Sequence, residues 1–195
     1  MNIKKYIEKV FDYVEKYAHS KYKMHALFWV AFFEQSFSII MPDLLIIPIS
    51  MYKKYSALYI ATFGAIASLF GGITTYVIAA YFGDRVLAYF DITTFLESTR
   101  IAYSQNVFWA MLVASFTPIP DKIFTIFGGI FKVAFLPFAI ALFLGKFTRY
   151  IIVAYIAENY GEKARDIILE KLNKVFIYLS IFILLLVSVY YFIIK

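Results

Sequence analysis

The chain of 195 residues contains no cysteine, which excludes a disulfide framework, a thiolate metal site and a cysteine nucleophile. Charge is also scarce, because only 16% of the residues are Asp, Glu, Lys or Arg and 63% are hydrophobic. A water-soluble fold of this size normally carries more charge. Formal charges are absent from residues 55–82, 101–120 and 175–194, and each run could cross the roughly 30 Å hydrocarbon slab as a helix. The sequence therefore predicts an integral membrane protein.

Several other classes of protein lack support. The net charge is +6, but the aromatic residues lie inside the apolar runs and not among Lys and Arg, so we expect no nucleic-acid partner. His19 and His25 are the two histidines of the chain, and a pair of histidines six residues apart is a weak metal signal, so we expect no metal site. The Gly-x-Ser-x-Gly, HExxH and CDP-alcohol transferase patterns are missing, which predicts no catalytic residues, no cofactor and no enzyme activity.

The two ends of the chain differ from its middle. Residues 1–23 alternate Lys, Glu and Tyr around apolar positions at helical spacing, which predicts an amphipathic interfacial helix. They contain no apolar core of a secretory signal, so we expect a cytoplasmic N-terminus. Residues 166–195 are predicted to form a linker and a last transmembrane helix. The membrane domain is predicted to occupy residues 24–165 of a multi-pass protein in the cell membrane.

The first apolar segment of this domain, residues 24–51, is interrupted. Glu34 and Asp43 place charge inside it, and we expect Pro42 and Pro48 to break its helix. The segment fits either one kinked span or a hairpin that enters the membrane and returns.

The second interrupted segment covers residues 102–131. Pro118 and Pro120 end its uncharged part, and the pieces that follow are too short to span alone. The least costly solution is a re-entrant hairpin that places Lys132 at the surface. Residues 133–157 then form a span of their own.

Two hairpins also place most Lys and Arg on the cytoplasmic side, as expected for membrane proteins. The predicted fold class is an all-α membrane bundle with two opposed re-entrant hairpins, which makes the two halves inverted repeats. An offset of 74 residues gives weak sequence support by aligning Gly71, Tyr76, Ile78, Ala80 and Tyr81 with Gly145, Tyr150, Ile152, Ala154 and Tyr155.

Six charged residues lie at membrane depth in this topology, where charges usually face protein or a water-filled cavity. One interpretation is a site for a phosphate-bearing lipid, with basic groups at the headgroup and an acid that exchanges a proton. The bases are Lys122, Lys146 and Arg149, and the acids are Glu34, Asp43 and Asp121. The alternative is that these six residues only form salt bridges that hold the hairpins in place. Asp43 and Asp121 follow prolines and could also cap helices.

Three motifs resemble one known family. Residues 33–48 (Phe33-Glu34-Gln35 to Pro48), residues 115–129 around Pro118, Pro120 and Asp121, and Gly145-Lys146-Phe147-Thr148-Arg149-Tyr150 are similar to the DedA family, also called SNARE-associated Golgi or VTT-domain proteins. The resemblance covers roughly residues 27–165 and is strongest to the short YqaA-like branch.

The resemblance implies two opposed re-entrant hairpins and a role in moving lipids between leaflets, as scramblases do. It also places Glu34 and Asp43 at the acidic positions of the first hairpin. The chain departs from transporting relatives in having Ser115 and Asp121-Lys122 where they often carry arginines. We therefore expect a translocator of an anionic lipid, a phospholipid or a polyprenyl phosphate. The rival interpretations are a non-transporting structural membrane protein and a lipid-modifying enzyme, and the sequence leaves a homo-oligomer open.

Overall fold

The computed structural model describes residues 20–36, 41–52, 54–90, 100–117, 121–161 and 178. All regular elements in these residues are α-helices. The first half of the described chain forms α2 (Lys23–Glu34), α3 (Asp43–Met51) and α4 (Ala57–Phe90). The second half forms α6 (Val107–Phe116), α7 (Lys122–Ile130) and α8 (Phe135–Tyr160), with a helical turn at residues 100–105 before it. The all-α prediction is therefore confirmed for the described residues.

Two of these helices are long and apolar enough to cross a membrane. They are Ala57–Gly83 within α4, with 27 residues, and α8, with 26 residues. A helix rises 1.5 Å per residue, so each is about 40 Å long and exceeds the roughly 30 Å hydrocarbon slab. These helices correspond to the spans predicted at residues 55–82 and 133–157.

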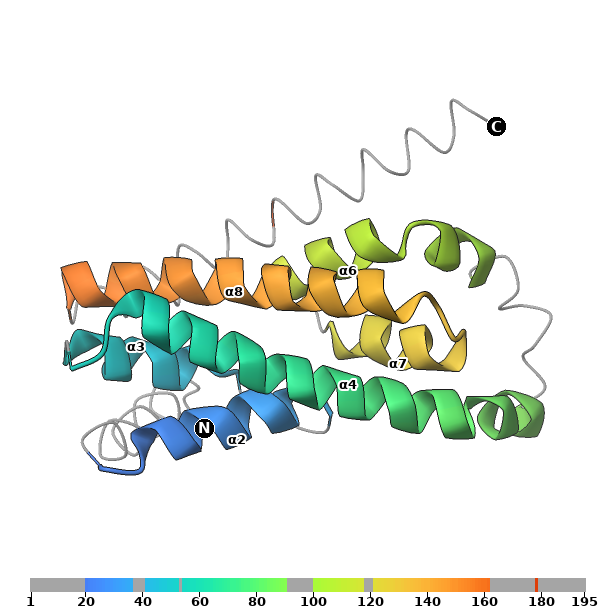
Figure 1. Cartoon of the computed structure of the whole chain (residues 1–195), viewed down its shortest axis with the longest axis horizontal. Helices are drawn as coiled ribbons and strands as arrows, with labels where there is room; N and C mark the ends of the chain where they lie inside the picture. Colours follow the sequence, from blue (N-terminus) through green and yellow to red (C-terminus); the bar gives the residue numbers. More distant parts are fainter. Residues whose placement is uncertain are drawn as a thin grey trace, which may run out of the picture.

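The two halves pack in a reciprocal way. In Figure 1, α2, α4 and α7 run in one direction along the long axis, and α3, α6 and α8 run in the other. The first short helix of each half packs on the long helix of its own half, as α2 on α4 and α6 on α8. The second short helix packs on the long helix of the other half, as α3 on α8 and α7 on α4. Each half therefore completes the core of its partner half.

Glycines allow the first short helix to lie close to the long helix in both halves. A Cβ on Gly71 of α4 would collide with the backbone carbonyl of Phe32 in α2. A Cβ on Gly145 of α8 would lie 2.6 Å from Cβ of Ser115 and 2.9 Å from the carbonyl oxygen of Leu112, both in α6. The two glycines are a pair in the 74-residue alignment, so the alignment marks equivalent contacts. Small residues in this role are typical of membrane helix packing.

Adjacent glycines in α7 give a testable contrast. Gly129→Ala should lower the free energy of unfolding by about 1–3 kcal/mol, because its Cβ would press on the Tyr76 carbonyl and lie 2.7 Å from Cβ of Ala79. Gly128→Ala gains the same helix propensity, but its Cβ would stay 3.4 Å from Phe138 and Tyr103. Thermal unfolding in detergent measures both variants, and equal shifts would contradict the assigned α4–α7 contact.

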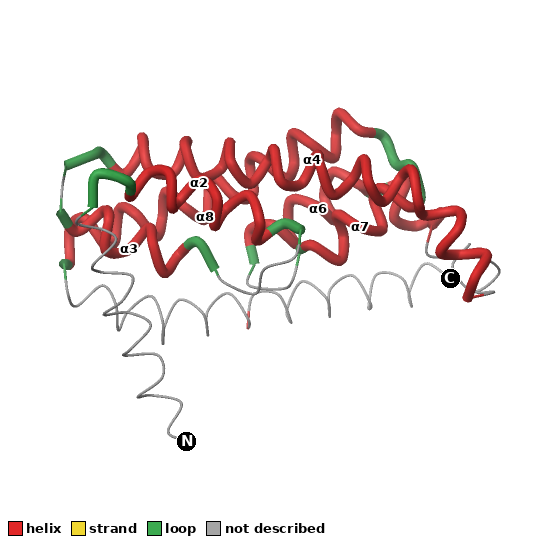
Figure 2. The backbone as a smooth tube through the Cα atoms, turned by 90° about the horizontal axis from the view of Figure 1, so that it is seen from below, coloured by secondary structure: helices red, strands yellow, loops and turns green. Residues whose placement is uncertain are grey.

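The buried apolar residues form two clusters toward opposite ends of α8. One cluster combines α2, α3 and the beginning of α4 with the last turns of α8, including Tyr150 and Val153. The other combines α6, α7 and the middle of α4 with the first turns of α8, including Phe138 and Leu142. The stretch of α8 between them, from Leu142 to Tyr150, carries the charged residues of the chain's centre. The residues that flank the breaks between α2 and α3 and between α6 and α7 contact Lys146 and Arg149 in this stretch. They lie near the middle of the long axis of the molecule (Figure 2).

One expectation about the first segment is wrong. Pro48 does not break a helix, since it lies inside α3, which continues to Met51. It is the sixth residue of that helix, so only one intrahelical hydrogen bond, to the carbonyl of Leu44, is lost. The break lies before Pro42, which is the N-cap of α3. Lys132 is exposed.

Several predicted features lie outside the described residues. These are the interfacial helix before residue 20, Pro118 and Pro120, and the linker and final span after residue 161, of which only residue 178 is described.

Candidate functional site

The site is built around one face of α8. Lys146 and Arg149 are three residues apart, so they project from the same side of the helix, and both are almost fully buried. Gly145 lets α6 lie against α8 beside them. Each base reaches the breaks between α2 and α3 and between α6 and α7. Acidic side chains contact the bases there.

Lys146 joins two acids from different halves of the chain. Its Nζ lies 2.9 and 2.8 Å from the two carboxylate oxygens of Glu34, the last residue of α2. It also lies 3.0 Å from Oδ2 of Asp121, which directly precedes α7. Charges in a protein interior are tolerated when they are paired in this way. The ammonium group of Lys146 therefore connects the end of α2 and the start of α7 to α8.

Arg149 holds a third acid. Its Nε and Nη2 both donate to the same oxygen, Oδ2, of Asp43, the first residue of α3, and the Nε distance is 3.2 Å. Its Nη1 donates to the carbonyl oxygen of Thr117, at 3.0 Å. Thr117 is the C-cap of α6, where helix carbonyls lack intrahelical partners. The other oxygen of Asp43, Oδ1, is buried and has no hydrogen-bond partner among the residues that the structure describes.

Gln35 links the acids to one another, and the sequence analysis assigned it no role. It is fully buried, and its Nε2 donates to Asp121 at 2.9 Å and to Glu34 at 3.3 Å. Its Oε1 accepts a hydrogen bond from Thr125 of α7, at 3.4 Å. An amide between two carboxylates supplies donors without adding charge. The only sequence signal for it was a polar side chain beside Glu34 in an apolar segment. We call the group of Glu34, Gln35, Asp43, Asp121, Lys146 and Arg149 the charge network.

The capping interpretation of the two aspartates does not hold. Asp121 stands at the N-cap position of α7 and Asp43 begins α3, but neither helix has a side-chain capping hydrogen bond. Both carboxylates instead turn toward the bases of α8. Their position at helix N-termini still favours negative charge, because the backbone N–H groups point toward it. Lys122, the remaining predicted base, is the first residue of α7 and is half-buried.

Residue 75 of α4 takes the place of Arg149 in the first half. Thr75 is the partner of Arg149 in the 74-residue alignment, and its Oγ1 donates to the carbonyl of Gln35 at 3.2 Å. Gln35 is the C-cap of α2, just as Thr117 is the C-cap of α6. Equivalent side chains therefore contact equivalent helix ends, but the first half uses a hydroxyl where the second uses a guanidinium. Both paired bases of the charge network come from α8.

The fold and the site define an all-helical membrane protein with a buried charge network between two apolar cores. Comparison with known families identifies it further, because residues 40–159 match the VTT domain. The chain belongs to the VTT-domain family, which is the DedA and SNARE-associated Golgi family. It is 34% identical over 189 residues to an uncharacterised protein of Haemophilus influenzae, covering 95% of this chain and 96% of that protein.

A second relative comes from Histophilus somni. It is also described as uncharacterised and is 31% identical over 157 residues, covering 79% of this chain and 82% of the relative. No solved structure matches the chain.

Proposed function

We propose that this protein binds an anionic lipid, a phospholipid or a polyprenyl phosphate, and moves it between the leaflets of the cell membrane in a proton-coupled manner. The chain acts as a translocator and not as an enzyme, and it belongs to the YqaA-like branch of the family. Its N-terminus lies on the cytoplasmic side, and the breaks between α2 and α3 and between α6 and α7 are the tips of two opposed re-entrant hairpins.

The observation that carries this proposal is how Arg149 holds Asp43. The guanidinium group uses two N–H donors on one carboxylate oxygen, and the second oxygen of Asp43 has no hydrogen-bond partner in the described part of the chain. Arginine binds phosphate best through two parallel hydrogen bonds to two oxygens. A lipid phosphate therefore offers this fork a better geometry than the carboxylate does, and it can displace Asp43.

When a lipid phosphate displaces Asp43 from Arg149, the carboxylate of Asp43 needs a proton. An ionised carboxylate without its cation is very costly in a water-excluded interior, so Asp43 takes up a proton when the phosphate occupies Arg149. Release of the lipid restores the ion pair and frees the proton. Glu34 exchanges protons with the surroundings, since its side chain is 15% exposed, against 8% for Asp43 and 5% for Asp121.

The hydrogen-bonded contacts also explain how binding could move helices. Lys146 and Arg149 connect α8 to the ends of α2, α3, α6 and α7. A headgroup that replaces one of these contacts therefore loosens a short helix from a long one, which is the change that a site with alternating access requires.

A leaflet-accessibility assay in proteoliposomes tests the proposal. Labelled phosphatidylglycerol, phosphatidylcholine and polyprenyl phosphate are placed in one leaflet, with and without a pH gradient, and protein-free vesicles are the control. We expect faster movement of the anionic lipids and a rate that depends on the gradient. If the reconstituted, folded protein moves none of these lipids under any gradient, the charge network is structural and the protein has no translocation activity.

A further inference from the structure

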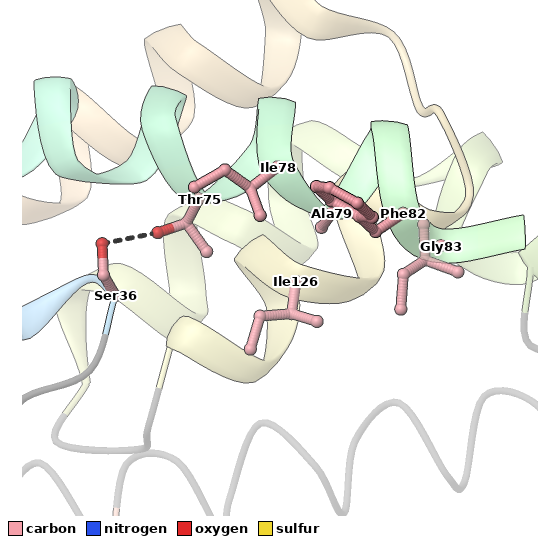
Figure 3. A pocket seen from close by; sticks show the side chains of 8 residues that line it. Ser36, Thr75, Ile78, Ala79, Phe82, Gly83 and Ile126 are labelled. Atoms are coloured by element: carbon pink, nitrogen blue, oxygen red, sulfur yellow. Dashed lines mark hydrogen bonds between the residues drawn. The ribbon is translucent and has the colours of Figure 1, made fainter. Parts of the chain in front are cut away.

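A pocket of about 270 Å³ lies between α4 and α7, next to the end of α2 (Figure 3). Its walls are hydrocarbon side chains, chiefly Ile78, Phe82, Ile126 and Ile130. The polar side chains lie together at one end, where the hydroxyl groups of Ser36 and Thr75 are 2.8 Å apart. The pocket therefore has an apolar body and one polar end.

The pocket opens toward the outside of the protein. Ile78 is 48% exposed, Phe82 46% and Ile126 37%, although all three are large apolar residues. Ile78 and Phe82 belong to the candidate span Ala57–Gly83, so the medium around them is the hydrocarbon of the bilayer. An apolar pocket that opens into hydrocarbon is accessible to a lipid chain.

The size of the pocket limits its occupant. Sites for drug-sized molecules usually have about 300–1,000 Å³, and a cavity of about 150 Å³ holds benzene. A pocket of about 270 Å³ is too small for a whole two-chain lipid. It suits a stretch of one hydrocarbon chain.

The polar end of the pocket continues into the charge network. Thr75 donates to the carbonyl of Gln35 at 3.2 Å, and the side chain of Gln35 donates to Asp121 and Glu34. Either hydroxyl group can be the donor in the Ser36–Thr75 bond. When Thr75 donates to Ser36 in place of the Gln35 carbonyl, the Ser36 proton is available to an anionic oxygen of a ligand. Thr75 is also the counterpart of Arg149. A headgroup at this end therefore lies beside Gln35, a member of the charge network.

We propose that the pocket binds one hydrocarbon chain of the lipid that the charge network translocates, with the headgroup at the Ser36–Thr75 end. This assignment rests on the proposed function and adds to it the place where the hydrocarbon chain of the lipid lies. It makes the cleft between α4 and α7 the route by which the lipid reaches the network from the bilayer.

Tryptophan quenching by lipids with brominated chains tests the assignment. The two native tryptophans, Trp29 and Trp109, are 52% and 66% exposed and can be replaced by phenylalanine. Phe82→Trp then reports on the pocket. Phe70→Trp is the matched control, because Phe70 lies on the same helix, is 54% exposed and does not line the pocket. The full chain is reconstituted in phosphatidylcholine with brominated phosphatidylglycerol or brominated phosphatidylcholine as the probe.

We expect brominated phosphatidylglycerol to quench Phe82→Trp at about tenfold lower mole fraction than brominated phosphatidylcholine, because its headgroup has a net negative charge and no trimethylammonium group to place at the polar end. Phe70→Trp should show no headgroup preference. Adding Ser36→Ala, which removes the hydroxyl group that donates to the headgroup, should reduce the preference at Phe82→Trp while quenching remains. Thr75→Val, which keeps the shape and removes the partner of Ser36, is the second variant if the first does not fold.

Two results would overturn the assignment. Equal quenching by both lipids at Phe82→Trp would mean that the pocket meets only bulk lipid. No quenching would mean that it is closed to lipid chains. Quenching and translocation are measured separately, so selective quenching without lipid movement would refute the proposed function and leave lipid binding in the pocket intact.

Discussion

Arg149→Met should abolish lipid translocation and lower the free energy of unfolding by about 3–5 kcal/mol, because it leaves Asp43 as a buried carboxylate without its cation. The double variant Arg149→Met with Asp43→Leu removes both charges and fills the space with apolar groups. Replacing a buried ion pair in this way is often neutral or stabilising. We therefore expect the double variant to regain most of its thermal stability and to remain inactive in proteoliposomes.

A variant that is stable but does not transport lipid distinguishes the two interpretations of the charge network, a site for a lipid phosphate and a set of salt bridges that only hold the helices together. Tyr150→Phe is the matched control, because Tyr150 is buried beside Arg149 and its hydroxyl group is hydrogen-bonded to Ser68, at 3.0 Å, and to no other described residue. That variant should lose about 1 kcal/mol and keep transport. Wild-type transport in the stable double variant would show that the Arg149–Asp43 pair serves structure alone.

Glu34→Gln should weaken the pH dependence of translocation and reduce its gradient-driven rate about tenfold or more. An amide has nearly the shape of a carboxylate, but it cannot bind and release a proton in this range, and it loses the ion pair with Lys146. Lys146 keeps its contact with Asp121 at 3.0 Å, so we expect the variant to fold. The measurement is the lipid flux over a series of pH gradients, at equal amounts of reconstituted protein.

Glu158→Gln provides the comparison for this result. Glu158 lies on α8 like the bases of the network, but its carboxylate accepts the backbone N–H of Ala57 at 3.1 Å. We expect its pH profile to match that of the wild type. If Glu34→Gln keeps the same profile as Glu158→Gln, proton exchange does not pass through Glu34.

The apolar runs and the interruptions within them could be located from the sequence because both are local properties. The length of a run without charge decides whether it can span the membrane as a helix. This criterion predicted the helices observed as α4 and α8. Pro48 shows the limit of such rules. A proline usually breaks a helix, but the packing of α3 against α8 keeps the helix intact at the loss of one hydrogen bond.

The pairing of the charged residues was out of reach of the sequence. Lys146 contacts Glu34, 112 residues away, and Arg149 contacts Asp43, 106 residues away. Three bases and three acids can be paired in many ways, and only the packing of the helices selects among these pairings. Gln35 was missed for the same reason, since an amide has no charge to mark its partners.

Composition and the spacing of apolar residues were thus sufficient to define a helical membrane protein with charges in its interior, because hydrocarbon imposes that requirement on every segment separately. The reciprocal packing of the halves, the sharing of two bases of α8 among three acids and the pocket between α4 and α7 depend on contacts between distant segments. Such contacts are set by how side chains of different helices fit together, so they were decided only when the chain folded.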